Sequence, residues 1–389
     1  MIPIVYNIRN LAARKTTTLT AILGVALVAF VFSTVIMLSR GIQGTLGKSG
    51  SPDVAIVLRQ GSEVELSSSV EEAQVGLLLT GPGVKKDPDG SPIGAGEVVV
   101  ILAMEKLGSK KGVANVQIRG VTDGVARLRP TISIVNGRPA RPGTDEAMVG
   151  KSLHRRFRGL DVGQSFELRK GRSVRVVGVF ADDGSSFESE VWCDRDTLRS
   201  AFGRYTTVSS VHVRLASSAQ FDTFKTFVER DKQLGLQALR ETDYYSRQSE
   251  GMTRFVIKLG QLIAMFFSIG AMIGAMITMH ASVSDRRREI GTLRALGFTR
   301  AQVLISFLLE SILLALAGGL LGAIASTGMG LVHFTMVNFR SWSEMTFSFE
   351  PHARIVLSAL INAALMGLFG GILPAIRASR IPPARAMRG

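Results

Sequence analysis

The stretch Ser284–Leu304, SDRRREIGTLRALGFTRAQVL, decides the fold, because it lies between two apolar segments that are each long enough to cross a bilayer. Within it, Ile290, Leu293 and Leu296 recur at roughly one-turn spacing, which predicts a short helix with one apolar face. Gly297 follows as a residue suited to the left-handed position past a helix end. The stretch therefore predicts an amphipathic helix held between two membrane spans.

A second helix is predicted to follow, because Thr299 and Gln302 have the spacing of a capping box. The stretch also carries five arginines within fifteen residues, namely Arg286, Arg287, Arg288, Arg294 and Arg300. A basic amphipathic helix between membrane spans is typical of a docking site for a partner. The same arginines would also keep a loop in the cytosol by the positive-inside rule alone, so the residues leave both interpretations open.

Four apolar segments indicate an integral membrane protein. They are predicted at residues 19–38, 259–279, 303–331 and 355–376. Most of the formal net charge of +15 is concentrated in three short segments that flank these spans: residues 1–17, the Ser284–Leu304 stretch and residues 377–389. The charge therefore indicates topology and contact with anionic lipid rather than binding to nucleic acid.

We expect an integral membrane α-helical protein with four transmembrane helices and a large α+β extracytoplasmic domain inserted between the first and second. The expected order is an N-terminal amphipathic helix and first span (1–40), the extracytoplasmic domain (41–254), the second span (255–280), a cytosolic loop (281–302), the third span (303–332), a short extracytoplasmic loop (333–354), the fourth span (355–376) and a cytosolic tail (377–389). A secretory signal peptide is the rival interpretation of the first span, but its apolar run is long and no small-residue cleavage site follows it. Both termini are therefore expected in the cytosol.

The extracytoplasmic domain is predicted to mix strands and helices. Strands are predicted at residues 54–58, 97–104, 113–119, 165–168, 174–180 and 208–215, with Gly171 in a hairpin turn. Helices are predicted at residues 150–158, 195–202 and 219–234, and an exposed loop at 81–96. Residues 240–254 are predicted to continue the second span as a helix outside the membrane. In the short loop, Trp342 and Phe347 are candidate interfacial anchors.

The spans are rich in glycine, which lets helices approach closely in lipid. The glycines predicted to serve transmembrane packing are Gly270, Gly274, Gly318, Gly319, Gly322, Gly367, Gly370 and Gly371. Four helices make a thin bundle, so dimerisation is expected.

Signatures of catalysis and of nucleotide binding are not found in the sequence. Residues 41–49 (GIQGTLGKS) and 150–152 (GKS) miss the phosphate-loop pattern, because Ile42 and Asp145 stand where its first glycine belongs. The five histidines are scattered, and the lone Cys193 excludes an intramolecular disulfide. No catalytic, cofactor-binding or metal-binding residue is predicted.

Glu310 is the one acidic residue predicted within a span. A carboxylate in a membrane is costly and suggests a role such as a proton relay. Its position two turns from the basic loop also permits a structural pair with an arginine. Both interpretations stay open at the level of the sequence.

The segment SVSDRRREIGTLRALGFTRAQVLISFLLE resembles the signature of the FtsX/MacB-type (type VII) permeases of bacterial ABC transporters. In that family an E-I-G-x-x-[RK]-A-x-G motif follows the second span. The matching positions here are Glu289, Ile290, Gly291, Arg294, Ala295 and Gly297, with the later glutamate at Glu310. Residues 7–27, 137–180 and 371–388 resemble other parts of the family, whereas no resemblance is found for about 51–119.

The resemblance implies the permease subunit of an ABC transporter in the bacterial inner membrane. Its partners would be two copies of a separate cytosolic ATPase, which binds the ATP and Mg, and a second permease copy or a paralogue. A periplasmic adaptor, an outer-membrane channel and membrane lipid are further partners that the resemblance allows. The coupling helix would contact the ATPase through Arg286, Arg288, Glu289, Ile290, Gly291, Leu293, Arg294, Ala295, Leu296 and Gly297. We expect the apolar residues to supply affinity and the charges orientation.

The leading hypothesis is mechanotransmission, in which ATP hydrolysis by the partner moves the extracytoplasmic domain and drives export or extraction of a substrate. The alternative is an FtsX-like regulator that transports nothing and relays ATP hydrolysis to an envelope partner such as a cell-wall hydrolase. A stand-alone sensor or secondary carrier would need polar residues along several spans. The residues that qualify are Glu310, Lys258, Gln261 and Asn362.

Overall fold

The computed structural model describes residues 15–108 and 112–382. The chain forms two compact units. The helical unit comprises Met1–Gly41, Arg254–His333 and Ser348–Gly389, and the sheet unit comprises Ile42–Thr253 and Phe334–Phe347. Most of the predicted N-terminal amphipathic helix, and residues 383–389 of the predicted tail, lie outside the described residues.

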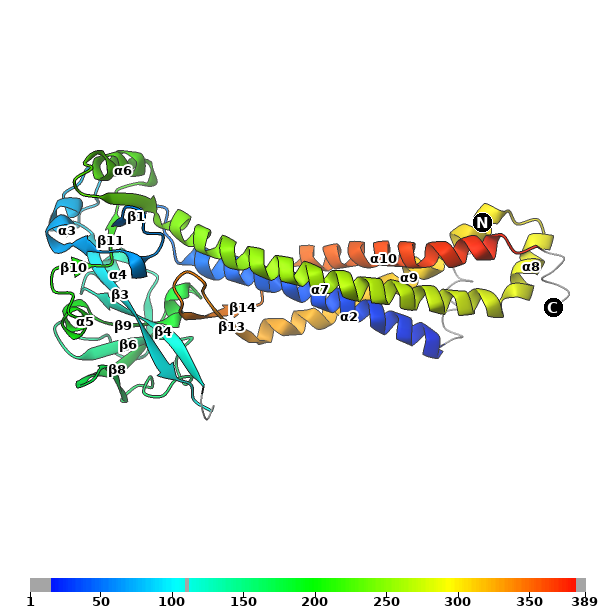
Figure 1. Ribbon diagram of the computed structural model, residues 1–389, viewed down its shortest axis with the longest axis horizontal. Coiled ribbons are helices and arrows are strands. Elements are labelled where there is room, and N and C mark those ends of the chain that lie inside the picture. The colour runs from blue at the N-terminus through cyan, green and yellow to red at the C-terminus, as the bar shows by residue number, and fades with distance from the viewer. Residues whose placement is uncertain (1–14, 109–111, 383–389) are drawn as a thin grey trace. The chain divides into compact units, whose positions relative to one another are not determined.

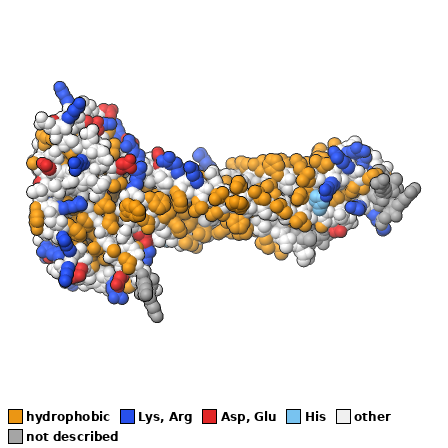
Figure 2. Space-filling view, in the orientation of Figure 1, with side chains coloured by type: hydrophobic (Ala, Val, Ile, Leu, Met, Phe, Trp, Pro, Cys, Tyr) orange, Lys and Arg blue, Asp and Glu red, His pale blue; other side chains and the backbone are white. Residues whose placement is uncertain are grey.

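Four of the described helices are long and apolar enough to cross a membrane. They are α2 (Lys15–Lys48), α7 (Glu241–Asp285), α9 (Arg300–Thr327) and α10 (Ala353–Ser379) (Figure 1). Figure 2 shows a nearly continuous hydrophobic surface along the middle of these helices, with Lys and Arg side chains gathered at the end that carries α8 (Arg287–Ala295). This distribution is typical of helices that cross a bilayer and carry basic residues at one membrane surface.

Two of these helices also supply residues to the sheet unit. α7 begins at Glu241, so residues 240–254 continue the span as a helix, as the sequence predicts. Glu241–Thr253 of α7 and Ile42–Lys48 of α2 belong to the sheet unit. Each of these two helices is therefore shared between the units without a break.

Ten strands of the described residues form one mixed sheet in the order β12-β1-β11-β3-β4-β9-β6-β8-β5, with β7 also paired to β8. Their bounds are β1 (Val54–Arg59), β3 (Gly94–Glu105), β4 (Val113–Val121), β5 (Ser133–Gly137), β6 (Glu146–Gly150), β7 (Ser165–Arg169), β8 (Arg172–Ala181), β9 (Glu190–Asp194), β11 (Ser210–Arg214) and β12 (Leu236–Arg240). Only the β4–β9 and β6–β8 pairings are parallel among the described strands. A separate short ladder joins β2 (Val70–Glu71) to β10 (Thr207–Val208).

Local sequence explains several of these elements. The β7–β8 hairpin is confirmed, and Gly171 in its turn has a φ of +82° that favours glycine. Helix α5 (Arg195–Phe202) is confirmed over its full length. The Asp194 side chain accepts hydrogen bonds from the amides of its first turn, and Gly203 ends it in the left-handed conformation.

The other helices of the sheet unit are α3 (Glu72–Leu79), α4 (Val125–Leu128) and α6 (Phe221–Arg230). The helix predicted at 219–234 is therefore confirmed but shorter, because a 3₁₀ turn over Ser218–Gln220 precedes it. Alternate strand residues, including Val57, Val98 and Val213, are fully buried with side chains of α3 and α6 in one core. The sheet unit is therefore an α+β unit whose main sheet is the ten-stranded one.

Two predictions about this unit are wrong. Residues 150–158 form turns rather than a helix, because Arg155 adopts a φ of +59° and interrupts any regular helix. The connection between α9 and α10 contains a β-hairpin of β13 (His333–Val337) and β14 (Glu344–Ser348). Phe347 is 0% exposed, so it is a core residue and not an interfacial anchor, whereas Trp342 is 63% exposed.

Candidate functional site

Helix α8 lies where the sequence predicts the amphipathic helix. Gly297 follows it with a φ of +99°, a conformation that favours glycine. The next helix, α9, opens with the predicted capping box: the Gln302 amide donates to Thr299 Oγ1 at 3.3 Å, and the Thr299 amide donates to Gln302 Oε1 at 2.8 Å. The local geometry of the loop is therefore confirmed.

The apolar residues of α8 do not share one environment. Ile290 is 1% exposed and packs in a core with residues of α7, α9 and α10, including Val283 and Phe307. Leu293 is half-buried, and Leu296 at the end of the helix is 73% exposed. The expectation that the whole stripe meets a partner is therefore wrong for Ile290, because its surface is already covered by this chain.

Arg286 is also buried, and its side chain connects α8 to α9. Its Nε donates to Glu289 at 2.9 Å and its Nη1 donates to Glu310 at 2.9 Å. The guanidinium carbon lies 5.1 Å from the centre of the Phe307 ring. Glu310 thus forms the structural pair with an arginine that was one of its two interpretations. Arg286 and the buried Gly291 support α8 and do not offer surface to a partner.

The exposed side of α8 is basic with an apolar end. Its exposed positions include Arg287, Arg288, Ala295, Leu296 and Gly297. Arg294 is turned back toward its own loop, because its Nη1 donates to the Phe298 carbonyl at 3.0 Å. Arg287 was absent from the predicted contact set, although it lies in the same run of arginines. The side chains that α8 and its end leave exposed are therefore mainly those of Arg287, Arg288 and Leu296.

Six of the predicted packing glycines lie against neighbouring helices of the same chain. A Cβ atom on Gly318 would lie 2.6 Å from the Ile22 carbonyl of α2, and one on Gly367 would lie 2.8 Å from the Ser311 carbonyl of α9. The other four in such contacts are Gly319, Gly322, Gly370 and Gly371. Gly270 and Gly274 of α7 differ, since a Cβ on either would meet nothing within 4 Å.

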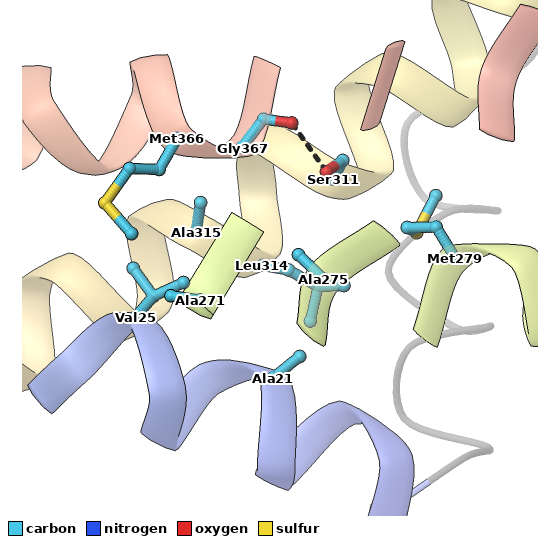
Figure 3. A pocket seen from close by; sticks show the side chains of 10 residues that line it. All are labelled: Ala21, Val25, Ala271, Ala275, Met279, Ser311, Leu314, Ala315, Met366 and Gly367. Carbon is cyan, nitrogen blue, oxygen red and sulfur yellow. Dashed lines mark hydrogen bonds between the residues drawn. The ribbon is translucent and has the colours of Figure 1, made fainter. Parts of the chain in front are cut away.

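The four membrane-crossing candidates enclose a cavity of only about 10 Å³ (Figure 3). All four helices line it with small or apolar side chains. Ser311, the one polar side chain in its lining, donates its hydroxyl to the Gly367 carbonyl at 2.7 Å. A space that holds at most about one water molecule offers no route for a polar solute.

A cluster of buried charges lies in the sheet unit around Arg119 of β4. The Arg119 guanidinium donates to Glu65 at 2.7 Å, to Glu97 at 2.8 Å and to Glu190 at 2.7 Å. Charges this deeply buried persist in proteins only when they are paired. We call the full set the ion network; its members are Glu65, Glu97, Arg119, Arg129, Glu190, His212 and Glu241.

His212 of β11 extends the ion network to helix α7. Its Nε2 lies 3.2 Å from Glu65, and its Nδ1 lies 3.1 Å from Glu241, the first residue of α7. Arg129 donates to Glu97 at 3.0 Å. The network therefore joins the first turn of α7 to four neighbouring strands of the sheet, β11, β3, β4 and β9.

The network keeps Glu97 and His212 charged. Burial acts to raise the pKa of Glu97, but the positive charges of Arg129, His212 and Arg119 outweigh it and lower that pKa to about 2. Burial acts to lower the pKa of His212, but the Glu97 charge and hydrogen bonds to Glu241 and Glu65 outweigh it and raise that pKa to about 9. His212 is therefore an imidazolium at neutral pH.

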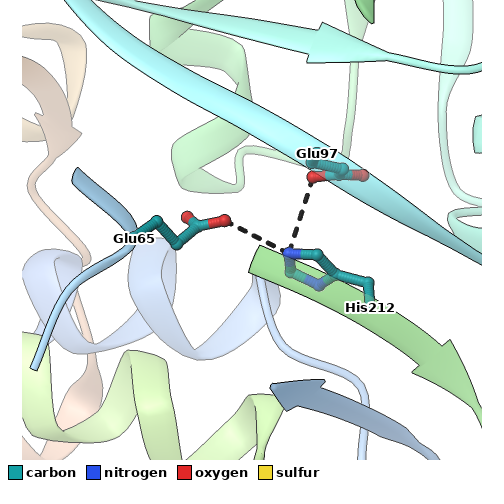
Figure 4. A group of neighbouring side chains, drawn as sticks. All are labelled: Glu65, Glu97 and His212. Carbon is teal, nitrogen blue, oxygen red and sulfur yellow. Dashed lines mark hydrogen bonds and ion pairs between the residues drawn. The ribbon is translucent and has the colours of Figure 1, made fainter. Parts of the chain in front are cut away.

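Glu65, Glu97 and His212 carry atoms of the kind that bind a metal ion, all within 4.8 Å of one another (Figure 4). Their surroundings do not fit a metal, because the Arg119 guanidinium already donates to both carboxylates and would repel a second cation. A metal ligand must also be a neutral imidazole, whereas the raised pKa of His212 keeps its ring protonated. These three residues belong to the ion network and do not form a metal centre.

The sequence analysis missed the ion network entirely. Its seven members come from residues 65 to 241 and share no local spacing. The available signal was a charged residue inside an otherwise apolar run, such as Arg119 in VANVQIRGV and Glu97 before VVVILAM.

Comparison with known proteins now identifies the family. Residues 16–230 match the family model of the MacB-like periplasmic core domain, and residues 262–383 match that of the FtsX-like permease C-terminal region. The first match includes residues 51–119, for which the motifs had indicated no resemblance.

Individual relatives agree with these matches. Over 223 residues the chain is 30% identical to the macrolide export ATP-binding/permease protein MacB of Burkholderia cenocepacia, which covers 54% of this chain and 31% of that protein. Over 289 residues it is 28% identical to a probable export ATP-binding/permease protein of Pseudomonas fluorescens, which covers 70% of this chain and 43% of that protein. The matched region thus spans less than half the length of either relative.

Among solved structures, the periplasmic region of MacB from Actinobacillus actinomycetemcomitans matches with a TM-score of 0.38 and 10% identity, covering 54% of this chain and 97% of that one. The periplasmic core-domain match alone spans more than half of the chain, and the permease match covers most of the remainder. The chain is therefore a membrane protein with an extracytoplasmic domain and belongs to the MacB/FtsX-like permease family of ABC transporters.

Proposed function

We propose that this chain is a permease subunit in the bacterial inner membrane, with its termini in the cytosol, and that it converts ATP hydrolysis by a separate ATPase into movement of its extracytoplasmic domain. That movement would drive export or extraction of a substrate. The observation that carries the proposal is that α8 has two different sides. Its exposed side is basic, and its other side is held by the buried Ile290 and by the Arg286–Glu310 ion pair. A helix fixed in this way would pass a movement of the bound ATPase on to α7 and α9 and would not bend.

The contact with the ATPase is assigned to the exposed side of α8. Arg287 and Arg288 would orient the partner, and Leu296 would fill an apolar depression on it. Two copies of the ATPase would bind the ATP and Mg, so this chain would need no cofactor of its own. The small cavity among the four helices is consistent with a substrate that does not pass between them.

Helix α7 is the proposed path of the movement. It is 45 residues long, or roughly 67 Å at the rise of an α-helix. One end adjoins α8, and the ion network holds the other end through Glu241. The side chain of Ser49, just past α2, accepts a hydrogen bond from the Ser186 amide at 2.8 Å, so the end of α2 is fixed in the sheet unit as well.

A second permease copy would pair along α7. Exposed apolar side chains, including Phe266 and Ile277, lie near Gly270 and Gly274 along α7, and a Cβ on either glycine would meet none of the described atoms within 4 Å. Glycines four residues apart let two helices approach closely in lipid. This pairing would give the two ATPase copies a pair of α8 surfaces to contact.

Co-purification tests the proposal. The full chain, extracted from native membranes, is expected to retain the ATPase encoded beside it, and the pair Arg287→Glu and Arg288→Glu is expected to release it. Reversal at Arg172, an exposed arginine of β8 that pairs with Asp145, is the matched control and should leave the complex intact. Retention of the ATPase by the α8 double variant would refute the assigned contact, and failure of any ATPase to associate would refute the function.

A further inference from the structure

The hairpin β13–β14 has both buried residues and exposed apolar residues. Asn338, Ser343, Glu344 and Phe347 are buried in the sheet unit. Four apolar residues are exposed, with exposed fractions of 41% for Phe334, 41% for Val337, 50% for Phe339 and 63% for Trp342. We call these four residues the hairpin patch.

The hairpin is bound firmly to the sheet unit. Glu344 forms ion pairs with both Lys106 and Arg156, and the Asn115 side chain donates to the Trp342 carbonyl at 3.0 Å. The Thr346 amide donates to Ser189 Oγ at 3.1 Å. The hairpin patch is therefore displayed on a fixed support and not on a loose loop.

Trp342 is held in a backbone conformation that a bulky residue rarely adopts. Its φ is +58°, which costs roughly 1–2 kcal/mol for an L-residue. Hydrogen bonds of the turn compensate: the Trp342 amide donates to the Asn338 carbonyl at 2.8 Å, and the Asn338 amide donates to the Ser343 carbonyl at 2.8 Å. A strained backbone that displays a tryptophan to the outside indicates an external contact.

The covalent chain keeps this patch near the end of a membrane span. Helix α9 ends at Thr327, and the 3₁₀ helix Gly328–Leu331 follows it directly. At about 2 Å per 3₁₀ residue and at most about 3.5 Å for each residue after it, Phe334 lies within roughly 20 Å of the end of α9. The connection therefore limits how far the start of the hairpin can lie from the end of that span.

We propose that the hairpin patch inserts into the outer interface of the lipid bilayer, with Trp342 at the level of the headgroups. Tryptophan is enriched at this depth because its ring is apolar and its indole N–H is polar. Arg340, in the turn of the hairpin, forms an ion pair with Glu63 at 2.8 Å, so its charge is compensated and compatible with insertion of the patch. The inference concerns lipid only and holds whether or not an ATPase drives the chain.

Fluorescence of the full chain in nanodiscs tests this. The sequence has two tryptophans, of which Trp192 is 0% exposed, so the difference between wild type and Trp342→Phe isolates the signal of Trp342. Lipids brominated near the headgroup are expected to quench that signal roughly two-fold, and aqueous acrylamide is expected to quench it weakly. As a control, Tyr205→Trp, at a position 67% exposed in the sheet unit, should show the reverse behaviour in the Trp342→Phe background.

Two results would overturn the proposal. Strong acrylamide quenching of Trp342 without lipid quenching would place the patch in water. Protection from both quenchers, together with a disulfide formed between two copies of a Trp342→Cys variant, would show that a second copy of the chain covers it. Trp342→Gly separates this role from a structural one, since glycine relieves the strained φ: the unfolding midpoint should not fall, while the lipid contact is lost.

Discussion

Two sites, one in each unit, hold buried charged side chains, and they compensate these charges in different ways. In the helical unit, Arg286 bridges Glu289 and Glu310 across a short loop. In the sheet unit, the ion network distributes four carboxylates and three cationic side chains over strands, turns and the start of α7. The first site ties α8 to α9, and the second ties a long helix to a sheet. The difference teaches that neighbouring segments can be joined by pairs to one arginine, whereas segments far apart in the sequence are joined here by a larger network.

Among the variants that test this comparison, removal of Arg119 is expected to have the largest effect on the free energy of unfolding. Arg119→Met leaves Glu65, Glu97 and Glu190 without their shared partner, and breaking a buried pair typically costs about 3–5 kcal/mol. We expect the sheet unit to unfold or to lose most of its stability, measured by denaturant titration of the full chain with Trp192 emission as the signal. Arg158→Met is the control, because Arg158 pairs with Glu105 at the surface and should show no resolvable change. Equal effects of the two variants would contradict a special role for the network.

Removal of Arg286 is expected to be next in size. Arg286→Met removes a charged partner from the buried Glu310, whereas Glu289 is partly exposed, so the loss should approach about 3 kcal/mol. The double variant with Glu310→Gln removes the stranded charge and should recover much of that stability. Thermal unfolding in detergent measures both variants. A double variant no better than the single one would show that Arg286 acts through Phe307 and not through charge.

The pH dependence of the sheet unit is a smaller test. The pKa of His212 rises from 6.5 to about 9 on folding, so its contribution is complete below about pH 6.5 and is lost as the pH rises through about 9. That contribution is on the order of 3 kcal/mol at most. The pKa of Glu97 is lowered to about 2, so its contribution is present above about pH 4.5 and is lost as the pH falls through about 2. Denaturant titrations at several pH values should show stability falling above pH 6.5 in the wild type.

His212→Gln should flatten this alkaline loss, because its side chain does not titrate. Glu65, Glu97, Glu241 and Arg129 also face His212, and the variant leaves all four in place. An unchanged alkaline slope in His212→Gln would assign the loss to another group.

The same comparison explains which parts the sequence could predict. The α8 turn with Gly297, the capping box at Thr299 and helix α5 follow from residues within one or two turns of each other, and short-range chemistry determines them. The Arg286–Glu310 pair was predictable as one of two interpretations, since 24 residues separate its members along one loop and helix. The ion network was not, because its pairings depend on strand order, and strand order is set by the whole sheet.

Burial was the other limit on prediction. Periodicity places Ile290 and Leu296 on the same apolar face, but only the packing of α7, α9 and α10 decides that one is covered and the other exposed. Phe347 was misplaced for the same reason, because aromatic character alone does not distinguish a core residue from a membrane anchor.

The smallest expected effect on stability is at Leu296. It tests the difference between the exposed and the buried residues of the α8 region. Leu296→Ser changes an exposed side chain, so the free energy of unfolding should change by no more than about 0.5 kcal/mol. Binding of the ATPase should nevertheless weaken. Ile290→Ser, on the same face of the helix, should instead destabilise the helical unit, because it places a hydroxyl in a core that is 1% exposed at that position. Thermal unfolding and ATPase co-purification, measured on both variants, separate the two roles. If Leu296→Ser retained full ATPase binding, the contact would rest on Arg287 and Arg288 alone.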